Sequence, residues 1–171
     1  MIAIKIIDIR QFMGKLLIRE SFDEFLLEKA QVLTASQLTL SGRRNRNWYD
    51  SDSWAEMEQK LSGDCFLMYW KEMKNTVFTY IKGNQSPDTM KLSFKASRGQ
   101  MESWLADSGA VEICRELKPD LFLSFRYEQE QLLLTTGTAF SQFQMDRTVE
   151  RAWDEAILQF LRREQIAYEE V

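Results

Sequence analysis

The chain has 171 residues, of which 44% are hydrophobic and 28% charged, and its 22 basic and 26 acidic side chains give a formal net charge of −4. This length fits one domain, and the apolar content can form a packed core, which excludes a disordered or low-complexity chain. The sequence contains no histidine, which excludes nucleophile–histidine catalytic pairs, histidine metal sites and a histidine pH switch.

The sequence has the features of a cytoplasmic protein. It contains no run of about 18 apolar residues, which a membrane-spanning helix would need. The apolar N-terminus is interrupted by Asp8 and Arg10, unlike a signal peptide. The two cysteines, Cys65 and Cys114, are too few for a disulfide framework or a metal site. We therefore expect buried, reduced thiols, no metal or cofactor, and no association with a membrane.

The first part of the chain predicts a strand, a helix and a hairpin. Residues 2–7 are apolar and β-branched, which favours a strand, and Asp8 can cap the helix that follows. Residues 25–34 and 37–42 alternate between apolar and polar side chains across a short connection, which predicts an antiparallel hairpin. A weak third strand is expected near 45–49. The apolar face of the helix consists of Ile9, Phe12, Met13, Leu16 and Leu17.

Residues 53–82 are predicted to form a helical insertion with two helices. Gly63 separates the two helices, Asp64 can cap the second one, and Gly83 follows its end. The segment 83–88, with the sequence GNQSPD, predicts a loop.

The second part of the chain predicts another strand, a helix and a three-stranded meander. A strand over 90–96 and a helix over 99–108 precede three strands over 121–127, 131–136 and 138–145. The third of these strands follows a turn placed at Gly137. Around this glycine, the segment TTGT offers hydroxyls that suit either a small anion or an ordinary hairpin turn.

The order strand–helix–strand–strand occurs twice, over 1–49 and 90–145, and a third strand completes the second copy. The insertion 53–82 separates the copies, and an amphipathic helix over 147–164 ends the chain. We therefore predict an α+β fold in which two such repeats build one antiparallel sheet, within a single domain spanning 1–171.

This arrangement resembles one domain of the DNA sliding clamps. The resemblance lies in MIAIKIIDIRQFMGKLL and FLLEKAQVLTASQLTLSG, and then in KLSFKASRGQMESWL and LFLSFRYEQEQLLLTTGTAFSQFQM. It implies two helices packed side by side under one continuous sheet. It does not extend to encircling DNA, because acidic residues cancel the basic ones on the two predicted helices. An unrelated α+β fold is the alternative.

The whole chain also resembles an uncharacterised family of small bacterial proteins. The segments that carry this resemblance are WKEMKNTVFTYIKGNQSP, LFLSFRYEQEQLLLTTGT and ERAWDEAILQFL. The family has no assigned activity, so the resemblance supplies no catalytic residue.

The candidate binding residues are arginines and aromatic residues. Guanidinium groups pair with phosphates and aromatic rings stack on bases, so the segment 43–49 predicts a nucleic-acid contact; a solvated strand end with Trp48 folded inward is the alternative. Trp54 and Trp70 could form an exposed patch for a partner, although core packing explains them equally. The residues of the first candidate site are Arg43, Arg44, Arg46, Trp48 and Tyr49.

Three functions remain open from the sequence. The first is a non-enzymatic binding or scaffold module for a protein or nucleic-acid partner. The second is a self-associating structural protein that pairs sheet edges into a homo-oligomer. The third is a histidine-independent enzyme that uses carboxylates, which the lack of any nucleophile motif argues against.

Overall fold

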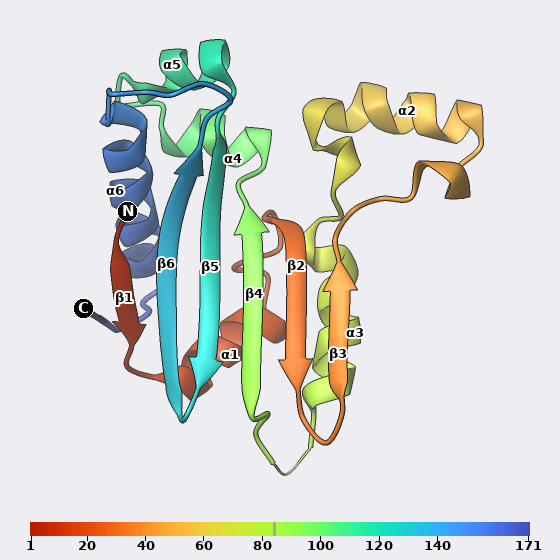
Figure 1. Cartoon of the computed structure of the whole chain (residues 1–171), viewed down its shortest axis with the longest axis vertical. Helices are drawn as coiled ribbons and strands as arrows, with labels where there is room; N and C mark the ends of the chain where they lie inside the picture. The colour runs from red at the N-terminus through yellow and green to blue at the C-terminus, as the bar shows by residue number, and fades with distance from the viewer. Residues whose placement is uncertain (84) are drawn as a thin grey trace.

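The computed structural model describes residues 1–83 and 85–171, and in them the centre is a seven-stranded antiparallel sheet with the strand order β3-β2-β4-β5-β6-β1-β7 (Figure 1). The predicted α+β class is confirmed. The strands are β1 (Ala3–Ile6), β2 (Leu26–Leu33), β3 (Gln37–Ser41), β4 (Thr89–Lys95), β5 (Asp120–Glu128), β6 (Gln131–Ala139) and β7 (Tyr168–Glu170).

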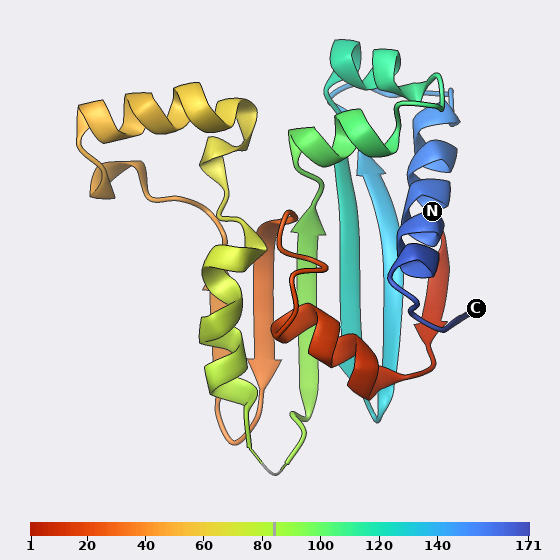
Figure 2. The ribbon, with the colours of Figure 1, turned by 180° about the vertical axis from the view of Figure 1, so that it is seen from behind.

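The helices cover one face of this sheet and leave the other open. Helices α1, α3 and α6 lie on the face of the sheet that points toward the viewer in Figure 2, and α4 and α5 lie at one end of the sheet. The described residues place no helix on the opposite face, which points toward the viewer in Figure 1. The helices are α1 (Ile9–Leu17), α2 (Ser51–Leu61), α3 (Trp70–Ile81), α4 (Arg98–Trp104), α5 (Ala110–Leu117) and α6 (Thr148–Arg163), with the 3₁₀ helices η1 (Arg46–Trp48) and η2 (Ser62–Phe66).

The core fills the space between the sheet and the three covering helices. Its centre is the Phe22 ring, whose centroid lies 5.4 Å from Phe12, 5.6 Å from Phe125 and 5.2 Å from Phe160 in edge-on arrangements. Because side chains alternate along a strand, every second residue of β4, β5 and β6 enters this core, and the intervening residues lie on the open face. Among the described helices, none combines the length and apolar content needed to cross a bilayer.

Several predicted elements are confirmed. Asp8 caps α1 by accepting a hydrogen bond from the Gln11 amide at 2.9 Å. The hairpin predicted over 25–34 and 37–42 forms as β2 and β3, and the C-terminal helix forms as α6. Of the predicted loop 83–88, Asn84 lies outside the described residues.

Other predicted elements are wrong. No turn occurs at Gly137, because β6 continues through it in register with Phe122 of β5, and the strand predicted over 138–145 ends at Ala139. The segment 45–49 contains the 3₁₀ turn η1 instead of a strand. The second helix of the insertion begins at Trp70 instead of Asp64. The short strand β7 was not predicted.

The two halves of the chain do not share one topology. Strands β4 and β5 are direct neighbours, whereas β6, β5 and β4 separate β1 from β2. Helix α1 therefore crosses the covered face, while α4 and α5 stay at the end of the sheet (Figure 2). Within residues 1–83 and 85–171, α1 and α4 do not lie side by side as the helices of a clamp domain do, and the clamp-like repeat is not confirmed.

Both cysteines should react slowly with a thiol reagent in the folded protein. Cys65 and Cys114 are free and buried, and burial raises the pKa of both thiols, to about 11 for Cys114. Near pH 8 only about one Cys114 thiol in a thousand would then be the reactive thiolate. We expect dithiobisnitrobenzoate to titrate both thiols in urea but neither of them rapidly in native buffer. A rapidly reacting native thiol would contradict this structure.

Candidate functional site

The predicted site residues 43–54 lie in and beside a projection that we call the arm, residues 45–66, which contains η1, α2 and η2. Two antiparallel segments form its stem: the Arg44 amide donates to the Phe66 carbonyl at 3.0 Å, and the Met68 amide donates to the Gly42 carbonyl at 2.7 Å. The arm extends beyond β3, away from the rest of the sheet, in both views (Figures 1 and 2).

Arg44 holds the stem against α3. Its side chain is only 4% exposed and forms an ion pair with Glu72 at 2.6 Å. It also donates to the Leu67 carbonyl at 3.1 Å and to the Tyr49 hydroxyl at 3.4 Å. These internal partners use the donors that a phosphate would need, so Arg44 serves the structure of the arm.

The remaining arm residues divide into a packed group and an exposed group. The Arg46 guanidinium lies 5.0 Å from the ring centroid of Trp54. Trp54 is only 5% exposed, so the hypothesis that it contributes to an exposed patch is wrong. Trp48 is 82% exposed, so the alternative in which it folds inward is wrong. Arg43 is exposed as well, and its role in binding stays a prediction.

Trp70 does not lie on a surface. Its exposure is 0%, its indole packs against Phe94 with centroids 5.1 Å apart, and its Nε1 donates to the Leu16 carbonyl at 2.7 Å. The hypothesis that Trp70 contributes to an exposed patch is therefore corrected, because no partner can reach it.

The open face of the sheet collects basic side chains that are dispersed in the sequence. Two of them have acidic partners: Lys95 pairs with Asp120 at 2.5 Å, and Arg126 pairs with Glu128 at 2.6 Å. Among the described residues, Lys5, Lys29 and Lys91 form no ion pair. The basic residues that alternate with buried ones, and so share this face, are Lys5, Lys29, Lys91, Lys95 and Arg126.

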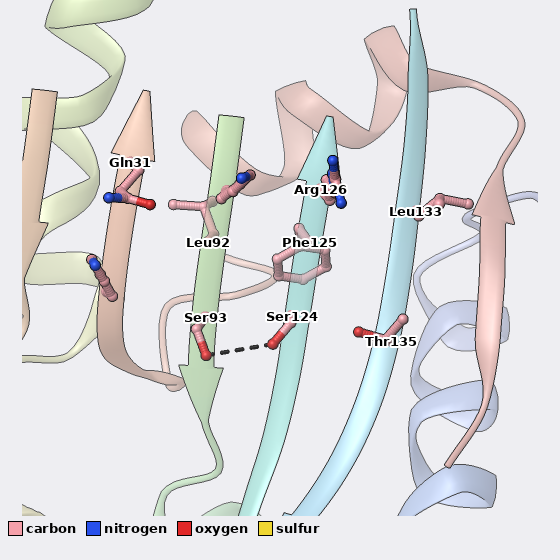
Figure 3. A pocket seen from close by; sticks show the side chains of 10 residues that line it. Gln31, Leu92, Ser93, Ser124, Phe125, Arg126, Leu133 and Thr135 are labelled. Atoms are coloured by element: carbon pink, nitrogen blue, oxygen red, sulfur yellow. Dashed lines mark hydrogen bonds between the residues drawn. The ribbon is translucent and has the colours of Figure 1, made fainter. Parts of the chain in front are cut away.

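Small hydroxyl residues form the floor of a shallow hollow in this face. The strand register sets Lys29 beside Ser93, Ser93 beside Ser124, and Ser124 beside Thr135. Figure 3 shows these hydroxyls on neighbouring strands, with the Ser93 and Ser124 oxygens 3.4 Å apart. Because short side chains lie between longer neighbours, a hollow of about 500 Å³ remains above them.

Two cations face each other at the rim of this hollow. Lys91 of β4 is the direct cross-strand partner of Arg126 of β5, and Lys29 lies one diagonal step away on β2. Residues directly opposite on antiparallel strands have Cβ atoms about 5 Å apart, and like charges there are destabilising. Glu128 pairs with Arg126 at 2.6 Å and offsets part of this repulsion, but the pair is exposed and therefore weak. A bound anion would relieve the remainder. We call Lys29, Lys91 and Arg126 the cationic cluster.

Sequence reasoning missed the cationic cluster because no linear motif contains it. Each cation is an isolated polar residue in its own alternating strand, separated from the others by tens of residues. The alternation shows that each one leaves the core, but only the order and register of the strands place them together.

Asp64 is the buried carboxyl that the enzyme hypothesis requires. Burial raises its pKa, and burial together with the nearby Asp64 charge raises the pKa of Tyr69 to about 12. However, Asp64 accepts hydrogen bonds from the Arg98 amide at 3.0 Å and the Tyr69 hydroxyl at 3.3 Å. The other acidic residues lining its hollow are held in ion pairs, so no free carboxylate faces it within the described part of the chain.

The described residues also contain no group of three or more Cys, Asp or Glu side chains placed to hold a metal ion. The open face has the chemical groups of an anion site, with cations at the rim of the hollow and hydroxyl donors on its floor.

Comparison with known proteins gives a family without an assigned role. Neither the curated proteins nor the solved structures contain a match to the chain. A family model described as a family of unknown function, DUF5721, matches residues 15–169. This range covers α3, α6, the whole arm and the strands from β2 to β6, but it leaves out β1 and most of α1. The chain belongs to the DUF5721 family, which confirms the resemblance to an uncharacterised family.

Proposed function

We propose that this protein is a non-enzymatic binding module whose open sheet face holds the phosphate backbone of a single-stranded nucleic acid. The observation that supports this most directly is the pairing of Lys91 with Arg126 across neighbouring strands, above a floor of hydroxyl groups. A chain with a net charge of −4 gains nothing in solubility from placing two cations face to face. Two neighbouring cations attract an anionic ligand more strongly than one cation does.

The shape of the site favours a polymer over a small metabolite. Small-molecule sites enclose most of the ligand surface, whereas this hollow lies on an open sheet and is bounded only by neighbouring side chains (Figure 3). Of the aromatic residues, Phe122 alternates toward this face but is half-buried, so base stacking contributes little. Binding should therefore depend on phosphates and show little sequence preference.

The experiment is fluorescence anisotropy with a labelled oligo-dT at several salt concentrations. Three phosphate contacts predict a dissociation constant of about 10⁻⁶ to 10⁻⁴ M and a log–log salt slope of roughly −2. The double variant Lys91→Gln/Arg126→Gln should bind several-fold more weakly, with the slope reduced in size by about 1.4. The same variant should change stability by no more than about 0.5 kcal/mol in urea unfolding, because it removes both the Lys91–Arg126 repulsion and the exposed Arg126–Glu128 ion pair.

The control is Arg10→Gln/Lys60→Gln, which removes two exposed cations from α1 and α2 and changes the net charge equally. We expect it to bind as the unmodified protein does. Equal losses in both double variants, or no oligonucleotide binding at low salt, would refute the proposal. Binding of polyglutamate without oligo-dT binding would also refute it and would indicate an acidic protein partner.

A further inference from the structure

The edge strand β3 lacks the features that usually protect a sheet edge. It has five residues, QLTLS, with no charge and no proline, and it pairs with β2 in unbroken register. Natural edge strands are commonly protected by lysine, proline, bulges or short length. Within the described residues, its outer edge has no strand partner, so its backbone groups remain available for a further strand.

The opposite edge of the sheet is shorter and carries charge. Strand β7 has only three residues, and two of them are Glu169 and Glu170. A short acidic edge resists pairing with another strand. The molecule therefore has one protected edge and one unprotected edge, which favours a closed pair over an extending fibre.

The arm provides a second, independent observation at the same edge. It extends past β3 (Figures 1 and 2), and its helix α2 packs mainly on η2 and not on the sheet. Trp48 is 82% exposed and Phe66 is 61% exposed on this arm. Large exposed aromatic residues are typical of interaction surfaces, and here they belong to an arm that extends past the free edge.

We propose that two copies of this chain associate through antiparallel pairing of their β3 strands, with each arm extending over the partner subunit. The strand is self-complementary about its centre. A pairing centred on Thr39 sets Leu38, which is half-buried in the single chain, opposite Leu40 of the partner subunit. The two-fold axis then runs perpendicular to the sheet, so each arm lies over the β2–β3 hairpin of the partner subunit.

This pairing keeps the open faces of both subunits on the same side of a continuous sheet. The association itself depends on the β3 edge and the arm, and it stands whether or not the cationic cluster binds nucleic acid. If both proposals hold, the dimer presents two cationic clusters to one strand, which strengthens binding through effective concentration.

The test is light scattering coupled to gel filtration over the micromolar range. The unmodified protein should have about twice the 20.2 kDa mass of one chain. Thr39→Lys and Thr39→Glu each place like charges across the two-fold axis and should weaken association about tenfold or more. An equal mixture of the two variants should recover the dimer, because opposite charges then meet. Trp48→Ala should also weaken association.

Gln131→Lys is the matched control, since it adds the same charge at an exposed position on β6, away from the edge. It should leave the mass unchanged. A monomeric unmodified protein would overturn the proposal, as would a dimer that persists in both Thr39 variants. A mixture of the Thr39 variants that stays monomeric would contradict a pairing centred on Thr39.

Discussion

Trp70→Ala should destabilise the protein by about 3–5 kcal/mol, the usual loss for removing a fully buried tryptophan. Trp70 is the first residue of α3 and lies between the sheet and α1. Its indole N–H satisfies the Leu16 carbonyl in the last turn of α1, where backbone carbonyls have no partner within the helix. The substitution therefore creates a cavity and also leaves a buried acceptor unpaired.

Trp48→Ala provides the matched control, because it removes the same side chain from a position that is 82% exposed. Its effect should stay within about 0.5 kcal/mol. Urea unfolding followed by far-UV circular dichroism measures both variants without relying on tryptophan fluorescence. Both should be made in a Thr39→Lys background, so that subunit association does not contribute to stability. Equal losses from the two substitutions would show that the core is placed incorrectly.

The fold was predictable wherever one short-range pattern determined the structure. The alternation in 25–34 and 90–96 and the helical spacing in 147–164 each correspond to a single buried face. The prediction failed at Gly137, where pairing with Phe122 on β5 outweighs the tendency of glycine to form a turn. It also failed at Asp64, whose side chain receives hydrogen bonds from residues elsewhere in the fold instead of capping a helix directly after it.

The candidate site was much less predictable than the fold. Arg43, Arg44 and Arg46 predict a binding site because they lie close together in the sequence, yet Arg44 forms internal bonds to Glu72 and Leu67. The cationic cluster is the opposite case, because its members come from β2, β4 and β5 and meet only through strand register. The sequence of a β-strand predicts which face of the sheet each residue occupies, but it does not predict which residue lies beside it on the next strand.

Of the Gly→Ala substitutions, Gly42→Ala should be the most damaging, with a loss of about 3 kcal/mol or more. A Cβ atom at Gly42 would lie 1.6 Å from the Leu27 carbonyl oxygen, a backbone atom that cannot rotate away. The Gly42 amide donates to the Glu28 carbonyl at 3.1 Å, and the Gly42 carbonyl accepts from the Met68 amide at 2.7 Å. Relief of the clash must therefore separate the arm stem from β2.

Gly14→Ala should stabilise the protein, whereas Gly42→Ala should destabilise it. Nothing lies within 4 Å of the position that a Cβ atom would take at Gly14, inside α1, and alanine is a better helix former than glycine by about 0.5–1 kcal/mol. Urea unfolding should therefore move to higher denaturant for Gly14→Ala and to much lower denaturant for Gly42→Ala. If Gly42→Ala kept full stability, the close contact of the arm stem with β2 would be wrong. The stem fixes the direction of the arm, so the proposed contact of the arm with a second subunit would then lose its structural basis.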